Sequence, residues 1–121
     1  MIVIIDDNKD IADYIFNILK NYEDASVFTD VDEFLYFFNE NRKKIDVVLM
    51  DYKMPKMNGS ELASKVKFIN KKCKIIIFTA YLLENEQWAP ADMYIRKPIS
   101  KDYLLRNVGE IMGKFLKKRA A

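Results

Sequence analysis

Five polar side chains that could carry out chemistry stand at the ends of short apolar segments, or in the loops that leave them, in this 121-residue chain. Uninterrupted apolar runs of this kind are typical of strands buried on both faces. The carboxyl ends of parallel strands meet at one edge of a sheet, where open α/β sheets have their ligand sites. We therefore expect these side chains to converge on one site. They are Asp6, Asp7, Asp51, Thr79 and Lys97.

These residue types together indicate phosphoryl chemistry. Three neighbouring carboxylates repel one another, so a site that keeps them needs a counter-charge. Mg²⁺ is suited to one or two carboxylates plus phosphate oxygens. Lys97 offers a second positive charge and Thr79 a directed hydroxyl donor. Asp51 would then be the nucleophile and would form an aspartyl phosphate.

Apolar and amphipathic segments alternate along the chain and would position these residues. Each apolar segment predicts a buried strand, and each segment with apolar residues at three- and four-residue spacing predicts a helix. This alternation is typical of βαβ units and a parallel sheet. A short helix at 84–88 is ended by Pro90. We expect strands at 2–5, 25–28, 46–50, 73–78 and 92–95, and longer helices at 10–22, 31–41, 60–69 and 101–118.

Composition excludes several classes of function. The chain has no histidine, which excludes Ser-His-Asp and Cys-His catalysis and any role as a phosphohistidine carrier. Its single cysteine, Cys73, allows no internal disulfide. The formal charge of +2 is too small to predict direct binding to nucleic acid. Because neither a secretory signal nor a membrane-spanning run is visible, we expect a cytoplasmic location without membrane insertion.

The ordered motifs resemble the receiver domain of two-component response regulators. The resemblance covers almost the whole chain, and its four pieces occur in the family's order. They are Ile5-Asp6-Asp7, Asp51-x-x-Met54-Pro55-x-Met57-x-Gly59, Thr79-Ala80, and Tyr94-Ile95-x-Lys97-Pro98.

This resemblance implies a fold, a function and partners. The expected fold is the flavodoxin-like, chemotaxis-type one: a five-stranded parallel sheet of order 2-1-3-4-5 with helices on both faces, forming one domain over residues 1–121. The implied function is to accept a phosphoryl group from a sensor histidine kinase or phosphotransfer protein and to signal to an output protein. Such a chain catalyses its own phosphorylation and slow dephosphorylation and is not a turnover enzyme.

The resemblance also implies roles for metal-binding residues. Asp7 corresponds to a direct Mg²⁺ ligand and Asp6 to a partner acting through water. Asp51 corresponds to the phosphoacceptor and a further metal ligand, and the backbone carbonyl of Lys53 to the last one. The Lys53 side chain should lie near the phosphoryl group, where we hypothesise that it slows loss of that group.

The remaining implied roles concern the response to phosphorylation. Thr79 and Tyr94 correspond to the switch pair, in which the hydroxyl is drawn inward and the ring follows. Lys97 would contact the phosphoryl group, and the Lys97–Pro98 bond is expected to be cis. Gly59 is expected to adopt a backbone conformation that other residues resist. The stretch 79–97, which holds part of the face through which many receivers signal, is about one helical turn shorter than is usual in the family.

Three other functions are compatible with this fold. A pseudo-receiver, a binding module that does not respond to phosphate, is the principal alternative. A metal-dependent phosphohydrolase would need a second acid two residues after the nucleophile, where this chain has Lys53. A flavodoxin-like electron carrier would need a hydroxyl- and glycine-rich loop in place of Asp6-Asp7-Asn8. The fold alone does not separate these functions.

Overall fold

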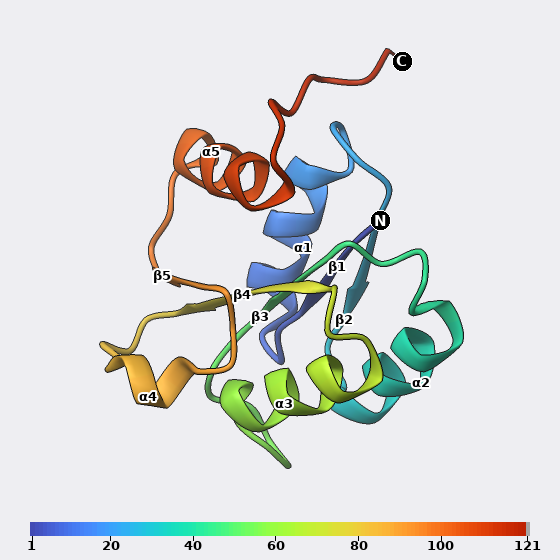
Figure 1. Ribbon diagram of the computed structural model, residues 1–121. Helices are drawn as coiled ribbons and strands as arrows, with labels where there is room; N and C mark the ends of the chain where they lie inside the picture. Colours follow the sequence, from blue (N-terminus) through green and yellow to red (C-terminus); the bar gives the residue numbers. More distant parts are fainter. Residues whose placement is uncertain (121) are drawn as a thin grey trace.

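A single parallel sheet organises the chain, in a computed structural model that describes residues 1–120 (Figure 1). The strand order is β2-β1-β3-β4-β5, and every neighbouring pair is parallel. The predicted topology is therefore confirmed. Residue 121, the last of the predicted domain, lies outside the described residues. The strands are β1 (Ile2–Ile5), β2 (Ala25–Phe28), β3 (Val47–Met50), β4 (Lys74–Thr79) and β5 (Met93–Arg96).

Helices cover both faces of the sheet. In Figure 1, α1 and α5 lie on one side of the strands, and α2, α3 and α4 lie on the other. The predicted short helix between β4 and β5 is present as a single turn, α4. The helices are α1 (Lys9–Leu19), α2 (Val31–Asn41), α3 (Gly59–Ile69), α4 (Asn85–Trp88) and α5 (Lys101–Met112).

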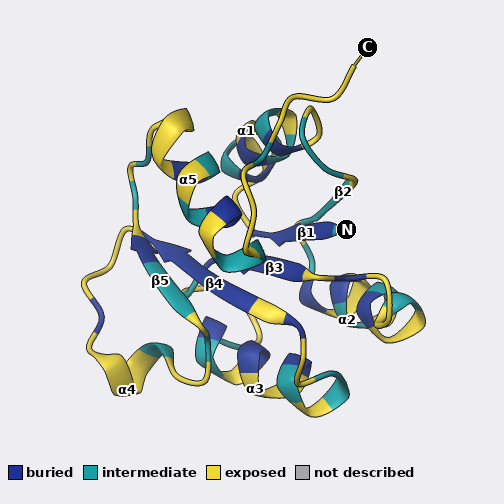
Figure 2. Ribbon diagram, turned by 45° about the horizontal axis from the view of Figure 1, so that its top comes forward, coloured by how far each residue is buried: buried dark blue, intermediate teal, exposed yellow. Residues whose placement is uncertain are grey.

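The apolar strands divide the core into two layers. Side chains alternate across a strand, so Val3 and Ile5 of β1 pack with α2 and α3, whereas Ile2 and Ile4 pack with α1 and α5. All four residues of β1 and of β3 are buried, as Figure 2 shows in dark blue. A strand with both faces covered needs no polar alternation, which explains the uninterrupted apolar runs in the sequence.

Polar residues set the start of each long helix. The side chains of Asn8, Asp30, Asn58 and Ser100 each accept a hydrogen bond from the first turn of the following helix. Asn58 forms a capping box with Glu61, in which each side chain accepts the other residue's backbone N–H. These caps fix where the loops at the carboxyl edge of the sheet end.

Two predicted helices end earlier than expected. We predicted a last helix to residue 118 with a solvated basic end, but α5 stops at Met112 because Gly113 adopts a left-handed conformation with φ of 71°. The following tail contacts the segment between α1 and β2, where Arg119 pairs with Asp24 at 2.8 Å. Helix α1 likewise ends at Leu19, not near residue 22.

Within residues 1–120, no helix combines the length and the apolar character that crossing a bilayer requires.

Candidate functional site

The register of the sheet brings the predicted site residues to one edge. The backbone N–H of Asp51 donates to the Ile5 carbonyl at 3.1 Å, which places Asp51 beside the acidic pair after β1. The backbone N–H of Lys97 donates to the carbonyl of Thr79 at 2.8 Å, which aligns the ends of β4 and β5. The order of the strands thus gathers residues that are far apart in the sequence.

Three carboxylates meet at this edge. Asp6, Asp7 and Asp51 each present an oxygen, and these oxygens lie within 4.8 Å of one another. Asp6 is 1% exposed, and its Oδ1 accepts the backbone N–H of Asn8 at 3.0 Å. Asp51 is 9% exposed and Asp7 is open to solvent. The cluster therefore has one solvent-facing side.

Lys97 faces the acids from β5. Its Nζ lies 2.9 Å from Asp6 Oδ2 and 3.5 Å from Asp51 Oδ2, and its side chain is 13% exposed. Burial raises the pKa of the Asp6 carboxyl, and the hydrogen bonds and positive charge that lower it do not offset this effect. One ammonium thus compensates part of a triple negative charge.

The donor set fits a hard divalent cation. Its side-chain ligands are all carboxylate oxygens, which Mg²⁺ prefers. Among residues 1–120, Lys97 is the one side chain whose cation pairs with Asp6 and Asp51. A cation on the open, Asp7 side would supply the missing positive charge.

The loop after β3 is held close to Asp51. Tyr52 donates its backbone N–H to Asp51 Oδ1 at 2.7 Å, and Gly59 donates its own to the Tyr52 carbonyl at 2.6 Å. A Cβ at Gly59 would lie 2.8 Å from the Asp51 carbonyl oxygen. The expectation of a special backbone conformation at Gly59 is wrong, because its φ is not positive; the position needs glycine for close packing instead.

A clamp of charged residues holds the same loop from outside. Lys56 has a φ of 76°, in the left-handed region that side chains disfavour. Its Nζ pairs with Asp32 at 2.5 Å and with Asp30 at 3.3 Å, at the start of α2. The loop that carries Lys53 is therefore tied to a neighbouring helix.

Lys53 and Tyr81 line the mouth of the site. A cleft of about 540 Å³ is lined by both residues together with Asp7, Asp51 and Lys97. The Lys53 Nζ lies 5.4 Å from the centre of the Tyr81 ring, a cation–π arrangement. Within residues 1–120, Lys53 forms no ion pair. Tyr81 was not among the predicted site residues, although its position two residues after Thr79 at the strand end was an available signal.

Thr79 and Tyr94 occupy adjacent strands but contact different groups. Thr79 is 1% exposed, and its Oγ1 accepts the backbone N–H of Tyr81 at 3.4 Å. The Tyr94 hydroxyl donates to the Tyr81 carbonyl and accepts the Leu83 N–H at 3.1 Å. The Tyr94 ring packs on Trp88 at 6.2 Å between centroids. The Lys97–Pro98 peptide bond that follows β5 is cis.

The chain is thus a doubly wound parallel α/β protein with three clustered carboxylates and one lysine at the carboxyl edge of its sheet. Residues 2–109 match the model of the response regulator receiver domain. The chain belongs to this family of receiver domains. Members act as signalling modules, bind Mg²⁺ at an aspartate cluster, and interact with histidine kinases or phosphotransferases and with output domains.

Individual proteins are similar over most of the chain. The chemotaxis protein CheY of Treponema pallidum is 26% identical over 117 residues, which are 92% of this chain and 81% of that protein. Sporulation initiation phosphotransferase F of Bacillus subtilis is 28% identical and 84% of each chain is covered. A receiver domain structure from Clostridium thermocellum is 29% identical, with a TM-score of 0.84 over 93% of each chain.

Other relatives are much longer than the matched region. The chain spans 19% of a cyclic di-GMP phosphodiesterase from Thermotoga maritima. It spans 52% of the response regulator SaeR of Staphylococcus epidermidis.

Proposed function

We propose that this receiver accepts a phosphoryl group on the carboxylate of Asp51 and relays the phosphorylated state to an output protein or domain. The donor would be a phosphohistidine on a sensor histidine kinase or a phosphotransfer protein, the partners with which receiver domains interact. The observation that carries this proposal is the position of Asp51, which opens on the cleft and has Lys97 at 3.5 Å and two further acids beside it.

The transfer is a displacement at phosphorus. An Asp51 oxygen attacks the phosphorus, an O–P bond forms, and the N–P bond to the donor imidazole breaks. The imidazole nitrogen leaves with the electron pair of that bond and takes a proton from water. In the slow dephosphorylation that ends the signal, water attacks the phosphorus and the O–P bond to Asp51 breaks. Inorganic phosphate is released, and Asp51 is again a free carboxylate.

Four groups of the chain would hold the metal. Asp7 would bind Mg²⁺ directly, Asp6 through water, and Asp51 and the Lys53 carbonyl directly. When bound, Mg²⁺ neutralises charge on phosphoryl oxygens and favours in-line transfer. Lys97 Nζ lies 2.9 Å from Asp6, so this lysine is held in place before any phosphoryl group arrives.

Phosphorylation would then change the contacts of Thr79, Tyr94 and Lys97. Lys97 would pair with a phosphoryl oxygen, and the Thr79 hydroxyl would donate to another. Inward movement of Thr79 removes its hydrogen bond to the Tyr81 N–H. The Tyr94 hydroxyl is bonded to the same 81–83 segment, so the segment and the ring move together.

Lys53 would prolong the phosphorylated state. Its ammonium lines the same cleft as Asp51 and lies over the Tyr81 ring, which limits its freedom. From there it would attract phosphoryl oxygens and disfavour their loss as phosphate, although solvent weakens the attraction. Dephosphorylation should be faster in Lys53→Ala than in the native chain; an equal or slower rate would rule this role out.

The central test uses acetyl phosphate and Mg²⁺, followed by intact-mass measurement. We expect one added phosphoryl group that hydroxylamine removes, as an acyl phosphate requires. The adduct should be lost in Asp51→Asn and with a chelator, and kept in Asp102→Asn, which changes an exposed aspartate on α5. Absence of an adduct with acetyl phosphate and phosphoramidate would instead favour the pseudo-receiver.

A further inference from the structure

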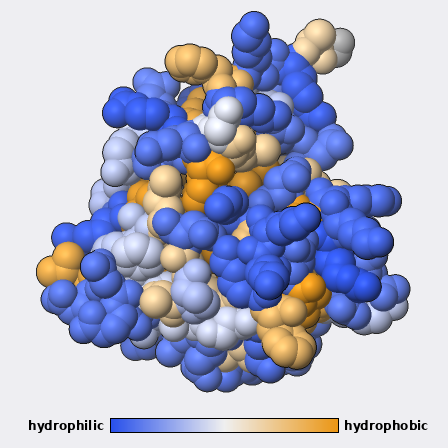
Figure 3. Space-filling view, viewed as in Figure 1, coloured by the Kyte–Doolittle hydropathy of each residue, from blue (hydrophilic) through white to orange (hydrophobic). Residues whose placement is uncertain are grey.

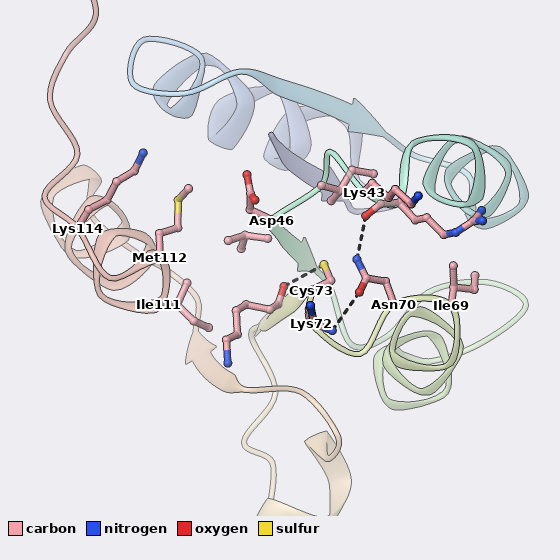
Figure 4. Close-up of a pocket in the computed structure, with 13 residues that line it drawn as sticks. Lys43, Asp46, Ile69, Asn70, Lys72, Cys73, Ile111, Met112 and Lys114 are labelled. Carbon is pink, nitrogen blue, oxygen red and sulfur yellow. Dashed lines mark hydrogen bonds between the residues drawn. The ribbon is translucent and has the colours of Figure 1, made fainter.

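A second hollow lies at the opposite edge of the sheet from Asp51. It has a volume of about 910 Å³ and is bounded by the starts of β3 and β4, the end of α5, and the loops that follow α2 and α3. Figure 4 shows Met112 and Lys114 on the α5 side, Ile69 and Asn70 on the α3 side, and Cys73 between them. Ligand pockets commonly span about 300–1,000 Å³, so this one is large enough for a ligand group.

The floor of the hollow is apolar. Figure 3 shows an apolar area surrounded by hydrophilic surface, and the aliphatic and sulfur side chains of the lining account for such an area. The lining contains no aromatic ring, so it offers nothing on which a nucleobase could stack. An aliphatic side chain suits this floor better. Ile69, Ile111 and Met112 are the half-exposed residues of this floor, and Ile45, Val47 and Cys73 lie buried beneath them.

The rim is strongly basic. Five lining residues are Lys or Arg and one is Asp, whereas the whole chain carries 20 basic and 18 acidic residues. The single acid, Asp46, is already paired with the terminal ammonium of Met1 at 2.7 Å. Within residues 1–120, Lys43, Lys72 and Lys74 form no ion pair and donate no side-chain hydrogen bond. Three lysines of the lining therefore have no protein counter-charge within the described residues.

The walls of the hollow are fixed by hydrogen bonds. Asn70 donates its side-chain amide to the Arg42 carbonyl at 2.9 Å and accepts the Lys72 N–H at 3.1 Å, which joins the two loops. Lys67 donates to the Cys73 carbonyl at 2.7 Å and pairs with Asp92 at 2.8 Å. A ligand would thus bind to a preformed surface, and little free energy would be lost in ordering that surface.

We propose that this hollow binds an acidic peptide segment of a partner protein. One aliphatic side chain of the segment would lie on the apolar floor, and carboxylates on either side of it would pair with Lys43, Lys72 and Lys74. Charge complementarity selects an acidic partner, and the floor without aromatic rings disfavours nucleic acid and nucleotides. Because the hollow is remote from Asp51, this binding is independent of phosphoryl transfer.

Fluorescence anisotropy tests the proposal with a dye-labelled polyglutamate peptide that has one central leucine. We expect saturable binding by the native chain with a dissociation constant below about 1 mM. The variant Lys43→Glu/Lys72→Glu/Lys74→Glu should bind about tenfold more weakly or worse. The control variant Lys65→Glu/Lys101→Glu/Lys118→Glu has the same net charge as the first triple variant, but its three exposed lysines lie outside the lining. It should bind the peptide within about twofold of the native chain.

Two further measurements separate the alternatives. A peptide with serine for the central leucine should bind about threefold more weakly, because the floor contact is lost. In amide NMR spectra of the native chain, the leucine peptide should shift signals of residues 42–46 and 70–74 and leave those near Asp51 in place. The proposal would be overturned if peptide binding did not saturate, if both triple variants lost the same affinity, or if the peptide shifted amide signals elsewhere in the chain. Tighter binding of single-stranded DNA or ATP than of the peptide would overturn it as well.

Discussion

Substitution of Lys97 by methionine tests whether this lysine compensates the acidic cluster. The change keeps an unbranched side chain of similar length but removes the ammonium that lies 2.9 Å from Asp6 and 3.5 Å from Asp51. At an effective dielectric constant of about 20, two charges 2.9 Å apart attract by about 6 kcal/mol. Desolvation cancels much of this, and loss of one partner of a buried pair costs about 3–5 kcal/mol.

The expected loss for Lys97→Met is about 3 kcal/mol at pH 7.5 without divalent ions, at the lower end of that range. Asp6 can take up a proton, because burial already raises its pKa and removal of Lys97 raises it further. When the pKa of a carboxyl is higher in the folded than in the unfolded state, the carboxyl lowers the free energy of unfolding at pH values above the folded pKa. This loss disappears at pH values below the unfolded pKa, which is near 4. The deficit of the variant should therefore shrink as the pH is lowered from 7.5 to 5.5.

Urea titration followed by circular dichroism measures these quantities. Lys65→Met, at an exposed position on α3, serves as the matched control and should change the free energy of unfolding by less than about 0.5 kcal/mol. The double variant Lys97→Met/Asp51→Asn should recover part of the loss, since one of the repelling charges is gone. A Lys97→Met protein as stable as the control at pH 7.5, with no pH trend, would refute the compensating role.

Three further predictions concern local features. Gly113→Ala should lower the free energy of unfolding by about 1 kcal/mol in urea, because φ is 71° there; no loss would mean that the helix end is not fixed by this residue. Asn58→Ala should also cost about 1 kcal/mol, since α3 loses its cap, whereas Asn58→Asp should largely retain stability. Burial raises the pKa of Cys73 to about 12, so a disulfide reagent at pH 8 should label the folded chain far more slowly than the urea-unfolded chain.

The sheet and the location of the site were predictable because both depend on local patterns. Runs such as residues 2–5 and 47–50 are apolar throughout, and only strands covered on both faces require this. Asp51 follows such a run, so its place at the carboxyl edge follows from the direction of the strand. The contact between Asp6 and Lys97 could be predicted only once the order of the strands was known. The resemblance to receiver domains supplied that order.

Features that depend on tertiary contacts were not predictable in the same way. The apolar spacing continues past Met112, so the pattern gave no reason to end the helix at Gly113, where a left-handed residue breaks it. Gly59 looked like a turn glycine, but its function is to admit the Asp51 carbonyl at a distance that a Cβ would block. The contact of Lys53 with Tyr81 joins two loops that no local pattern relates.

The pairing of Lys97 with Asp6 spans 91 positions of the chain, which has a consequence for synthesis on the ribosome. The acids at positions 6, 7 and 51 precede Lys97 in the sequence, so they emerge before their lysine. A nascent chain that has docked β1 against β3 therefore holds like charges together with no protein cation among them. Arrival of β5 brings in Lys97 and offsets part of this repulsion, so this strand favours completion of the sheet electrostatically as well as by its hydrogen bonds to β4.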